Sequence, residues 1–178
     1  MESLEQNEVK QVKQEIKRRK KDSEVEDLEQ YVTFVIGEET YGVEVLKVQE
    51  IIGMTRITHV PNTMDFMRGV INLRGSVVPV VDMRIKFNME EKEYDNFTVI
   101  LIVEVRERLV GMIVDAVSDV VAIPVNNIQE TPHFTTRIET DFIEGIGRID
   151  DQLIIILNVN KILTIEELEQ IDREKSTQ

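Results

Sequence analysis

The sequence predicts a mainly β protein with two small β-barrels in tandem, because one strand–turn–strand pattern occurs twice in it. The first copy runs from Phe66 to Phe87 and the second from Phe142 to Leu163, 76 positions later. Apolar strands upstream of the two copies carry Gly42 and Gly111 in equivalent places. A glycine inside an apolar strand is typical of a bulge or a sharp bend, which small barrels need at their corners.

The two copies divide the chain into parts of similar construction. Residues 29–90 are predicted to form mainly the first barrel and residues 97–163 mainly the second, joined by the polar stretch 88–96. Val80 and Ile156 occupy equivalent apolar positions, so each is expected in the core of its own barrel. The length permits a real core, since a fold of about 150 residues buries roughly 68–70% of its unfolded surface.

In the first half, a hairpin and a short helix are expected. The hairpin runs from Tyr31 to Glu44, with Gly37-Glu38-Glu39 as its turn. The stretch Leu46–Ile52 has apolar side chains at three- and four-residue spacing and is followed by Gly53. That pattern is typical of a short helix.

Short β-branched runs between turn residues predict the remaining strands. They are Val70–Leu73, Val77–Val81, Thr98–Val105, Leu109–Val114, Val117–Ile123, Gly145–Ile149 and Leu153–Val159. The strand at Thr98–Val105 is apolar on both faces, which indicates a position shared between packed layers. Asp82 is expected to cap a short helix that ends at Phe87.

The two ends of the chain differ in apolar content. Residues 1–28 are nearly all charged or amide-bearing, and their thin helical stripe consists of Val9, Val12 and Ile16. Such a segment predicts a charged flexible tail or a loose helix. Residues 164–172 are expected to form a C-terminal helix, because Thr164 and Glu167 make a capping-box pattern. Its apolar face, expected to dock on a barrel, is Ile165, Leu168 and Ile171.

The composition excludes several classes of function. A formal charge of −13 argues against nucleic acid as a partner, because that affinity comes from Lys and Arg that neutralise phosphates. The absence of Cys removes thiolate catalysis and suits a reducing compartment. No apolar run approaches the roughly 20 residues of a membrane helix, and the start has no apolar signal-peptide core. We therefore expect a cytoplasmic protein without direct membrane insertion.

No catalytic site, metal site or cofactor site is predicted. The two histidines are far apart in sequence and belong to no metal-binding spacing. Gly145-Ile146-Gly147 lacks the third glycine of a dinucleotide motif and leads into a strand rather than a helix. The absence of such chemistry shifts the expectation to binding surfaces. Arg74, at a predicted hairpin tip, suits a protein interface, although an exposed turn residue is the alternative.

Three ordered motifs resemble the CheW family of chemotaxis coupling proteins. They are Tyr41–Ile51 (YGVEVLKVQEI), Gly69–Gly75 (GVINLRG) with Val78–Arg84 (VPVVDMR), and Val114–Val120 (VDAVSDV). The resemblance covers about residues 29–172. It implies two SH3-like five-stranded barrels side by side. It also implies a non-enzymatic adaptor that joins the regulatory domain of the histidine kinase CheA to the cytoplasmic tip of methyl-accepting chemoreceptors.

The resemblance also implies where the partners bind. Val48, Glu50, Ile51, Arg74 and Val120 match positions at or beside a receptor groove between the barrels. Thr58 and Gly69 match first-barrel positions at the kinase face. Met83 and Ala116 are mild departures from the usual Leu and the frequent Gly of the family.

Two other functions fit the same fold. One is a coupling protein of a related chemosensory pathway, such as surface motility, with a different receptor. The other is a small-ligand-binding or enzymatic protein built on the same barrels. The resemblance favours the adaptor, which would lie in the cytoplasm and meet membrane-bound receptor arrays through protein contacts.

Overall fold

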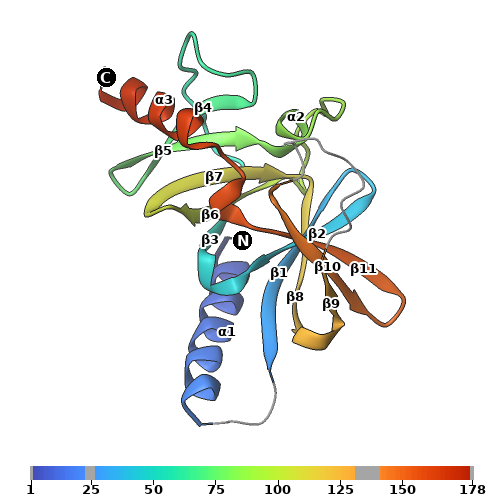
Figure 1. The fold of residues 1–178 in the computed structure, drawn as a ribbon. Helices are drawn as coiled ribbons and strands as arrows, with labels where there is room; N and C mark the ends of the chain where they lie inside the picture. Colours follow the sequence, from blue (N-terminus) through green and yellow to red (C-terminus); the bar gives the residue numbers. More distant parts are fainter. Residues whose placement is uncertain (1, 23–26, 131–140, 177–178) are drawn as a thin grey trace.

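A computed structural model describes residues 2–22, 27–130 and 141–176, and it confirms a mainly β fold with two sheets (Figure 1). The first sheet has the order β3 (Val48–Gly53), β6 (Val99–Val105), β7 (Arg108–Val114), β5 (Ser76–Asp82) and β4 (Met67–Leu73). The second sheet has the order β8 (Ala116–Pro124), β1 (Leu28–Ile36), β2 (Glu39–Glu44), β11 (Gln152–Leu157), β10 (Ile143–Ile149) and β9 (Ile128–Gln129).

The strand pairing departs from the predicted division into residues 29–90 and 97–163. The β1–β2 hairpin of the first half lies in the second sheet, and the β6–β7 hairpin of the second half lies in the first sheet. The short 3-10 helix η1 (Val45–Lys47) and the single residue Asp115 lead the chain directly from one sheet into the other. A duplicated sequence offers each hairpin two equivalent places, and the apolar pattern does not distinguish them.

The alignment of the two copies is confirmed by their internal pairing. β5 runs parallel to β7 with Val80 opposite Gly111, and β11 runs parallel to β2 with Ile156 opposite Gly42. The sheets thus repeat one pattern, in which β8, β1, β2, β11 and β10 correspond to β3, β6, β7, β5 and β4.

Gly42 and Gly111 permit close packing rather than the predicted bulges. A Cβ on Gly111 would lie 2.8 Å from Cγ2 of Ile100. The bulges of the two equivalent hairpins lie elsewhere, between Met67 and Gly69 and between Ile143 and Gly145.

Among the described residues, three apolar clusters form the core. Val80 belongs to a cluster made only by the first sheet, and Ile156 to one made only by the second, so these two residues lie in separate clusters. A larger cluster joins residues of both sheets and of the helices. β6 places Ile100 in the cluster of the first sheet and Leu101 in the shared cluster. This explains why its sequence is apolar on both faces.

The predicted helix at Leu46–Ile52 is wrong. Only Val45–Lys47 is helical, as a 3-10 turn, and β3 follows it and pairs with β6. Ile51 faces the shared cluster while Ile52 faces the cluster of the first sheet, so neighbouring residues point to opposite sides, as in a strand. A bulge between Val48 and Glu50 interrupts the alternation, which is why the apolar spacing resembled that of a helix.

The N-terminal segment is a docked helix rather than a flexible tail. The helix α1 spans Glu2–Asp22, and its Val9 and Ile16 are buried in the shared cluster. It packs on β3 and η1 (Figure 1). The predicted stripe is confirmed, and it suffices for docking because it meets an apolar surface that is already formed.

The α-helices α2 and α3 follow their predicted caps. Asp82 accepts hydrogen bonds from the backbone N–H groups of Arg84 and Ile85 at the start of α2 (Met83–Lys86). Thr164 and Glu167 form the reciprocal capping box that begins α3 (Ile165–Ser176). Leu168 and Ile171 of α3 are buried as predicted, whereas Ile165 is 59% exposed. Within the described ranges, no helix has both the length and the apolar character needed to span a membrane.

Candidate protein-binding surfaces

Arg74 and Glu50 form a two-pronged ion pair. Nη1 of Arg74 donates to Oε2 of Glu50 at 3.1 Å, and Nη2 donates to Oε1 at 2.9 Å. The Glu50 side chain is only 6% exposed, whereas that of Arg74 is 73% exposed. The carboxylate is thus covered by the guanidinium, and Arg74 is the member of the pair that a partner can reach.

A tight turn holds Arg74 at the tip of the β4–β5 hairpin, as the sequence predicted. Arg74 and Gly75 both have positive φ, at 50° and 88°, which matches a two-residue hairpin turn. Oδ1 of Asn72 accepts a hydrogen bond from the Gly75 N–H at 2.8 Å. Because β3 and β4 are opposite edges of the first sheet, the contact with Glu50 links its two ends.

Val48 and Ile51, which the resemblance places at or beside a receptor groove, are buried. Both belong to the same cluster as Val9 and Ile16 of α1, and Val120 of β8 packs against that cluster while half-buried. Nε2 of Gln6 donates to the backbone carbonyl of Ile51 at 3.2 Å. The sequence contained the α1 stripe but no signal that it would cover this face.

Thr58 and Gly69, the predicted kinase-face residues, lie against each other. The N–H of Thr58 donates to the Val70 carbonyl at 2.8 Å, and the N–H of Val70 donates back at 2.9 Å. A Cβ on Gly69 would lie 2.1 Å from the Thr58 carbonyl oxygen, and Gly69 has a φ of +144°. Thr58 is exposed, so this edge of the first sheet presents its side chain to solvent.

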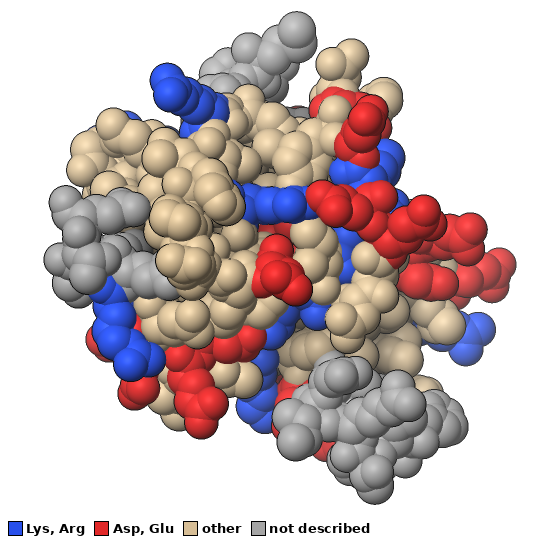
Figure 2. Space-filling model, turned by 90° about the horizontal axis from the view of Figure 1, so that it is seen from above, with Lys and Arg blue, Asp and Glu red and all other residues tan. Residues whose placement is uncertain are grey.

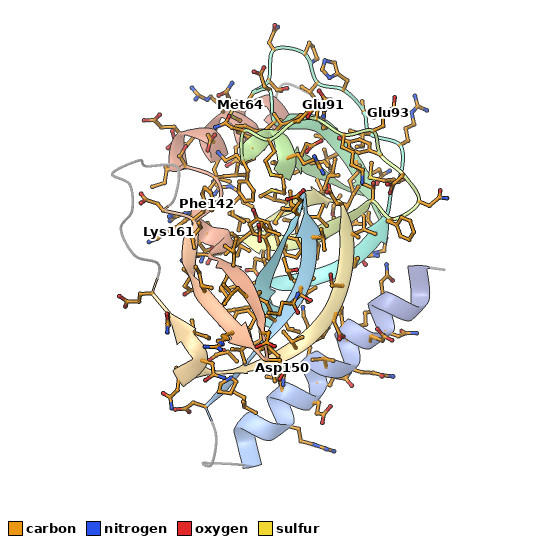
Figure 3. The ribbon with its side chains drawn as sticks, turned by 90° about the vertical axis from the view of Figure 1, so that its right-hand side faces the viewer. Met64, Glu91, Glu93, Phe142, Asp150 and Lys161 are labelled. Atoms are coloured by element: carbon orange, nitrogen blue, oxygen red, sulfur yellow. The ribbon has the colours of Figure 1, made fainter. Side chains whose placement is uncertain are left out.

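Residues beside the predicted sites fasten the stretch 88–96 to the first sheet. The Tyr94 hydroxyl donates to Oδ2 of the buried Asp82 at 2.8 Å, and Arg68 contacts Asp82, Tyr94 and Glu91. Burial, together with the bond to Asp82, raises the pKa of Tyr94 to about 12, so its hydroxyl keeps its proton. Figure 3 places Glu91 at the end of the molecule away from α1.

A second ion pair, which the sequence did not reveal, lies at a junction of the two sheets. Nε and Nη2 of Arg84 donate to the two carboxylate oxygens of Asp115 at 2.8 and 2.7 Å. The N–H of Gly37, in the β1–β2 turn, also donates to Asp115 at 2.8 Å. Burial opposes ionisation of Asp115, but the hydrogen bonds from Arg84 and Gly37 outweigh it and lower its pKa.

We expect Asp115→Asn to lower the free energy of unfolding by about 2 kcal/mol at pH 7, because it removes charge-assisted hydrogen bonds. A folded-state pKa below the unfolded value of about 3.9 means that the contribution is complete above that value. It is lost as the pH falls through the folded pKa. Urea unfolding from pH 7 to pH 3 should therefore show parent and variant converging in acid.

The control is Asp151→Asn, in the exposed β10–β11 turn, which should change stability little at any pH. If the free energies of unfolding of the parent and of Asp115→Asn differed by the same amount over the whole pH range, the role given to this carboxylate would be wrong.

The surface seen from above carries a large group of acidic side chains at its right and further ones at its centre and lower left, with Lys and Arg scattered among them (Figure 2). Over the part of the chain that the structure describes, no group of three or more His, Asp or Glu side chains is arranged to hold a metal ion. The candidate surfaces are therefore described by their shape, their apolar contacts and their ion pairs.

Comparisons with known proteins place the chain in a family. Residues 30–167 match the CheW-like domain. The chemotaxis protein CheW of Klebsiella aerogenes is 38% identical over 81% of this chain and 87% of its own length. CheW of Bacillus subtilis is 32% identical over 81% and 92%.

A solved structure shares the fold. The crystal structure of the scaffolding protein TtCheW from Thermoanaerobacter tengcongensis matches 79% of this chain and 96% of its own, with 35% identity and a TM-score of 0.74. With the family match and this fold, the chain belongs to the CheW family of non-catalytic chemotaxis scaffolding proteins.

Proposed function

We propose that the chain couples the cytoplasmic tip of methyl-accepting chemoreceptors to the histidine kinase CheA, by binding the regulatory domain of the kinase. Membership of the CheW family carries this proposal. The coupling would take place in the cytoplasm, at membrane-bound receptor arrays reached through protein contacts.

We assign the receptor to the face around β3 and the β4–β5 tip. Arg74 offers an exposed guanidinium whose direction is set by Glu50. A guanidinium held in this way suits a partner with carboxylates or helix-end carbonyls, because it presents a planar fork of donors. Val48, Ile51 and Val120 would supply the apolar part of the groove.

We assign the kinase to the edge of the first sheet at Thr58. Its exposed side chain lies beside β4, which has an open edge apart from the bridge to Thr58. Gly69 serves this face indirectly, since the absence of a side chain lets Thr58 approach β4.

The test is the affinity of variants for a soluble receptor-tip fragment and for the kinase regulatory domain. Arg74→Ala should weaken receptor binding about tenfold, the loss expected for a charge-assisted hydrogen bond. Arg74→Lys keeps the charge but loses the fork, so it should also bind more weakly than the parent. Glu50→Ala should not add fully to Arg74→Ala, because the two side chains act together.

Binding to the kinase domain should stay near the parental value in these variants. The matched variant is Thr58→Glu, which places a charge on the other surface and should weaken the kinase complex while sparing the receptor complex. If either class of variant weakened both complexes equally, the two surfaces would not be separate.

A further inference from the structure

The face assigned to the receptor is already covered by a helix of the same chain. Val48 and Ile51 are each at most 1% exposed, and they share a cluster with Val9 and Ile16 of α1. Figure 3 shows α1 running along the outside of the strands, where it forms no part of either sheet. We infer that β3 and η1 form a groove for one amphipathic helix, that α1 fills it, and that a receptor helix must displace α1 to bind.

The contacts of α1 define what the groove recognises. Val9, Val12 and Ile16 lie at three- and four-residue spacing, so they form one face of the helix. Gln6 adds a hydrogen bond to the Ile51 carbonyl, and β3 is an edge strand, with no strand of the described residues beside its outer backbone groups. A competing helix therefore needs a short apolar stripe and a side-chain donor near one end, as in the helix-in-groove mode of recognition.

The helix α1 can leave the groove at low free-energy cost. Only Val9 and Ile16 of its described side chains are fully buried apolar groups, and Val12 is half-buried. The other residues of the helix are mostly charged or amide-bearing, and a helix with so little buried surface opens at low free-energy cost. The family match begins at residue 30, so α1 lies outside the segment that matches.

Charge also holds α1 on the molecule. Residues 2–22 contain seven Lys and Arg and five Asp and Glu, a formal charge of +2. Since the whole chain carries −13, the remainder carries −15. The attraction between them weakens with salt, so the fraction of molecules with α1 undocked should rise with ionic strength.

This inference rests on the proposed receptor function, and full-length variants test it. In Val9→Glu/Ile16→Glu, two buried contacts of α1 are replaced by charges while the groove residues stay intact. The matched control is Asn7→Glu/Gln14→Glu, which adds the same two charges at exposed positions of α1. Hydrogen exchange of α1 and β3 amides reports docking, and titration with the receptor-tip fragment reports affinity.

We expect faster exchange of α1 in the double variant and about tenfold tighter receptor binding, because the binding-competent fraction is no longer limited by α1. Kinase-domain affinity should not change, and the control variant should match the parent. Gln6→Ala, a change too small to threaten folding, should tighten receptor binding by about twofold to threefold by the same reasoning.

Each of the other possible results refutes a specific claim of the inference. Undocked α1 with unchanged receptor affinity refutes competition but leaves the receptor function standing. Weaker receptor binding would make α1 part of the receptor site, which also refutes displacement. Unchanged exchange of α1 in the double variant refutes the assigned docking contacts. If neither parent nor variants bind the fragment, the proposed receptor function fails, and the competition fails with it.

Discussion

Gly69→Ala should lower the free energy of unfolding by about 3–5 kcal/mol, at the upper end of what single substitutions do. Two causes add at this position. The new Cβ would meet the Thr58 carbonyl oxygen at 2.1 Å, and that oxygen is backbone, held by the bridge to Val70. The φ of +144° is also one that side-chain-bearing residues rarely adopt. Urea unfolding of the purified variant measures the loss.

Gly75→Ala is the matched control for this substitution. Gly75 also has a positive φ, +88°, but a Cβ there would meet nothing within 4 Å. Gly75→Ala should lower the free energy of unfolding only by the backbone strain, about 1 kcal/mol. Equal losses in the two variants would show that the contact with Thr58 is not what requires glycine at position 69.

Ile156→Ala should cost about 2–4 kcal/mol, and Val80→Ala a similar amount, because each leaves a cavity among fully buried neighbours. The two residues are at 0% exposure in the separate clusters of the second and first sheets. Thermal or urea unfolding of both variants tests the equivalence of the two copies as well as their cores.

The same strands supply the controls. Leu153 of β11 and Val77 of β5 are about half exposed, so their replacement by Ala should change stability by less than about 0.5 kcal/mol. Core variants as stable as the parent would contradict the role of Val80 and Ile156 as equivalent core residues.

Local pattern predicted most elements of the fold but not which sheet they join. The cap at Asp82 and the capping box at Thr164 depend on residues close in sequence, and the structure confirms them. The exchange of hairpins depends on short connections such as η1 and on packing between distant strands. Local sequence patterns therefore do not predict which sheet each hairpin joins.

The candidate surfaces were also predicted only in part, because they too depend on contacts between residues that are distant in sequence. The sequence placed Arg74 at a hairpin tip, the resemblance placed Glu50 at or beside the same groove, and the structure joins the two in an ion pair. The sequence predicted a helix over Val48 and Ile51, because the bulge in β3 gives apolar residues a spacing like that of a helix. Arg84 and Asp115 each lie in a CheW-like motif, but the motifs are 31 positions apart at these residues and nothing in the sequence indicated that the two side chains pair.

The exchange of hairpins decides whether one copy of the repeat can fold without the other. Strands β1 to β5 on their own complete neither sheet, since β1 and β2 need β8 and β11 while β3 and β5 need β6 and β7. Two identical copies would complete both sheets by trading hairpins across a twofold axis, as domain-swapped homodimers do. The molecule thus has the form of such a dimer fused into a single chain, and cutting it between the copies would yield two mutually dependent subunits rather than two domains.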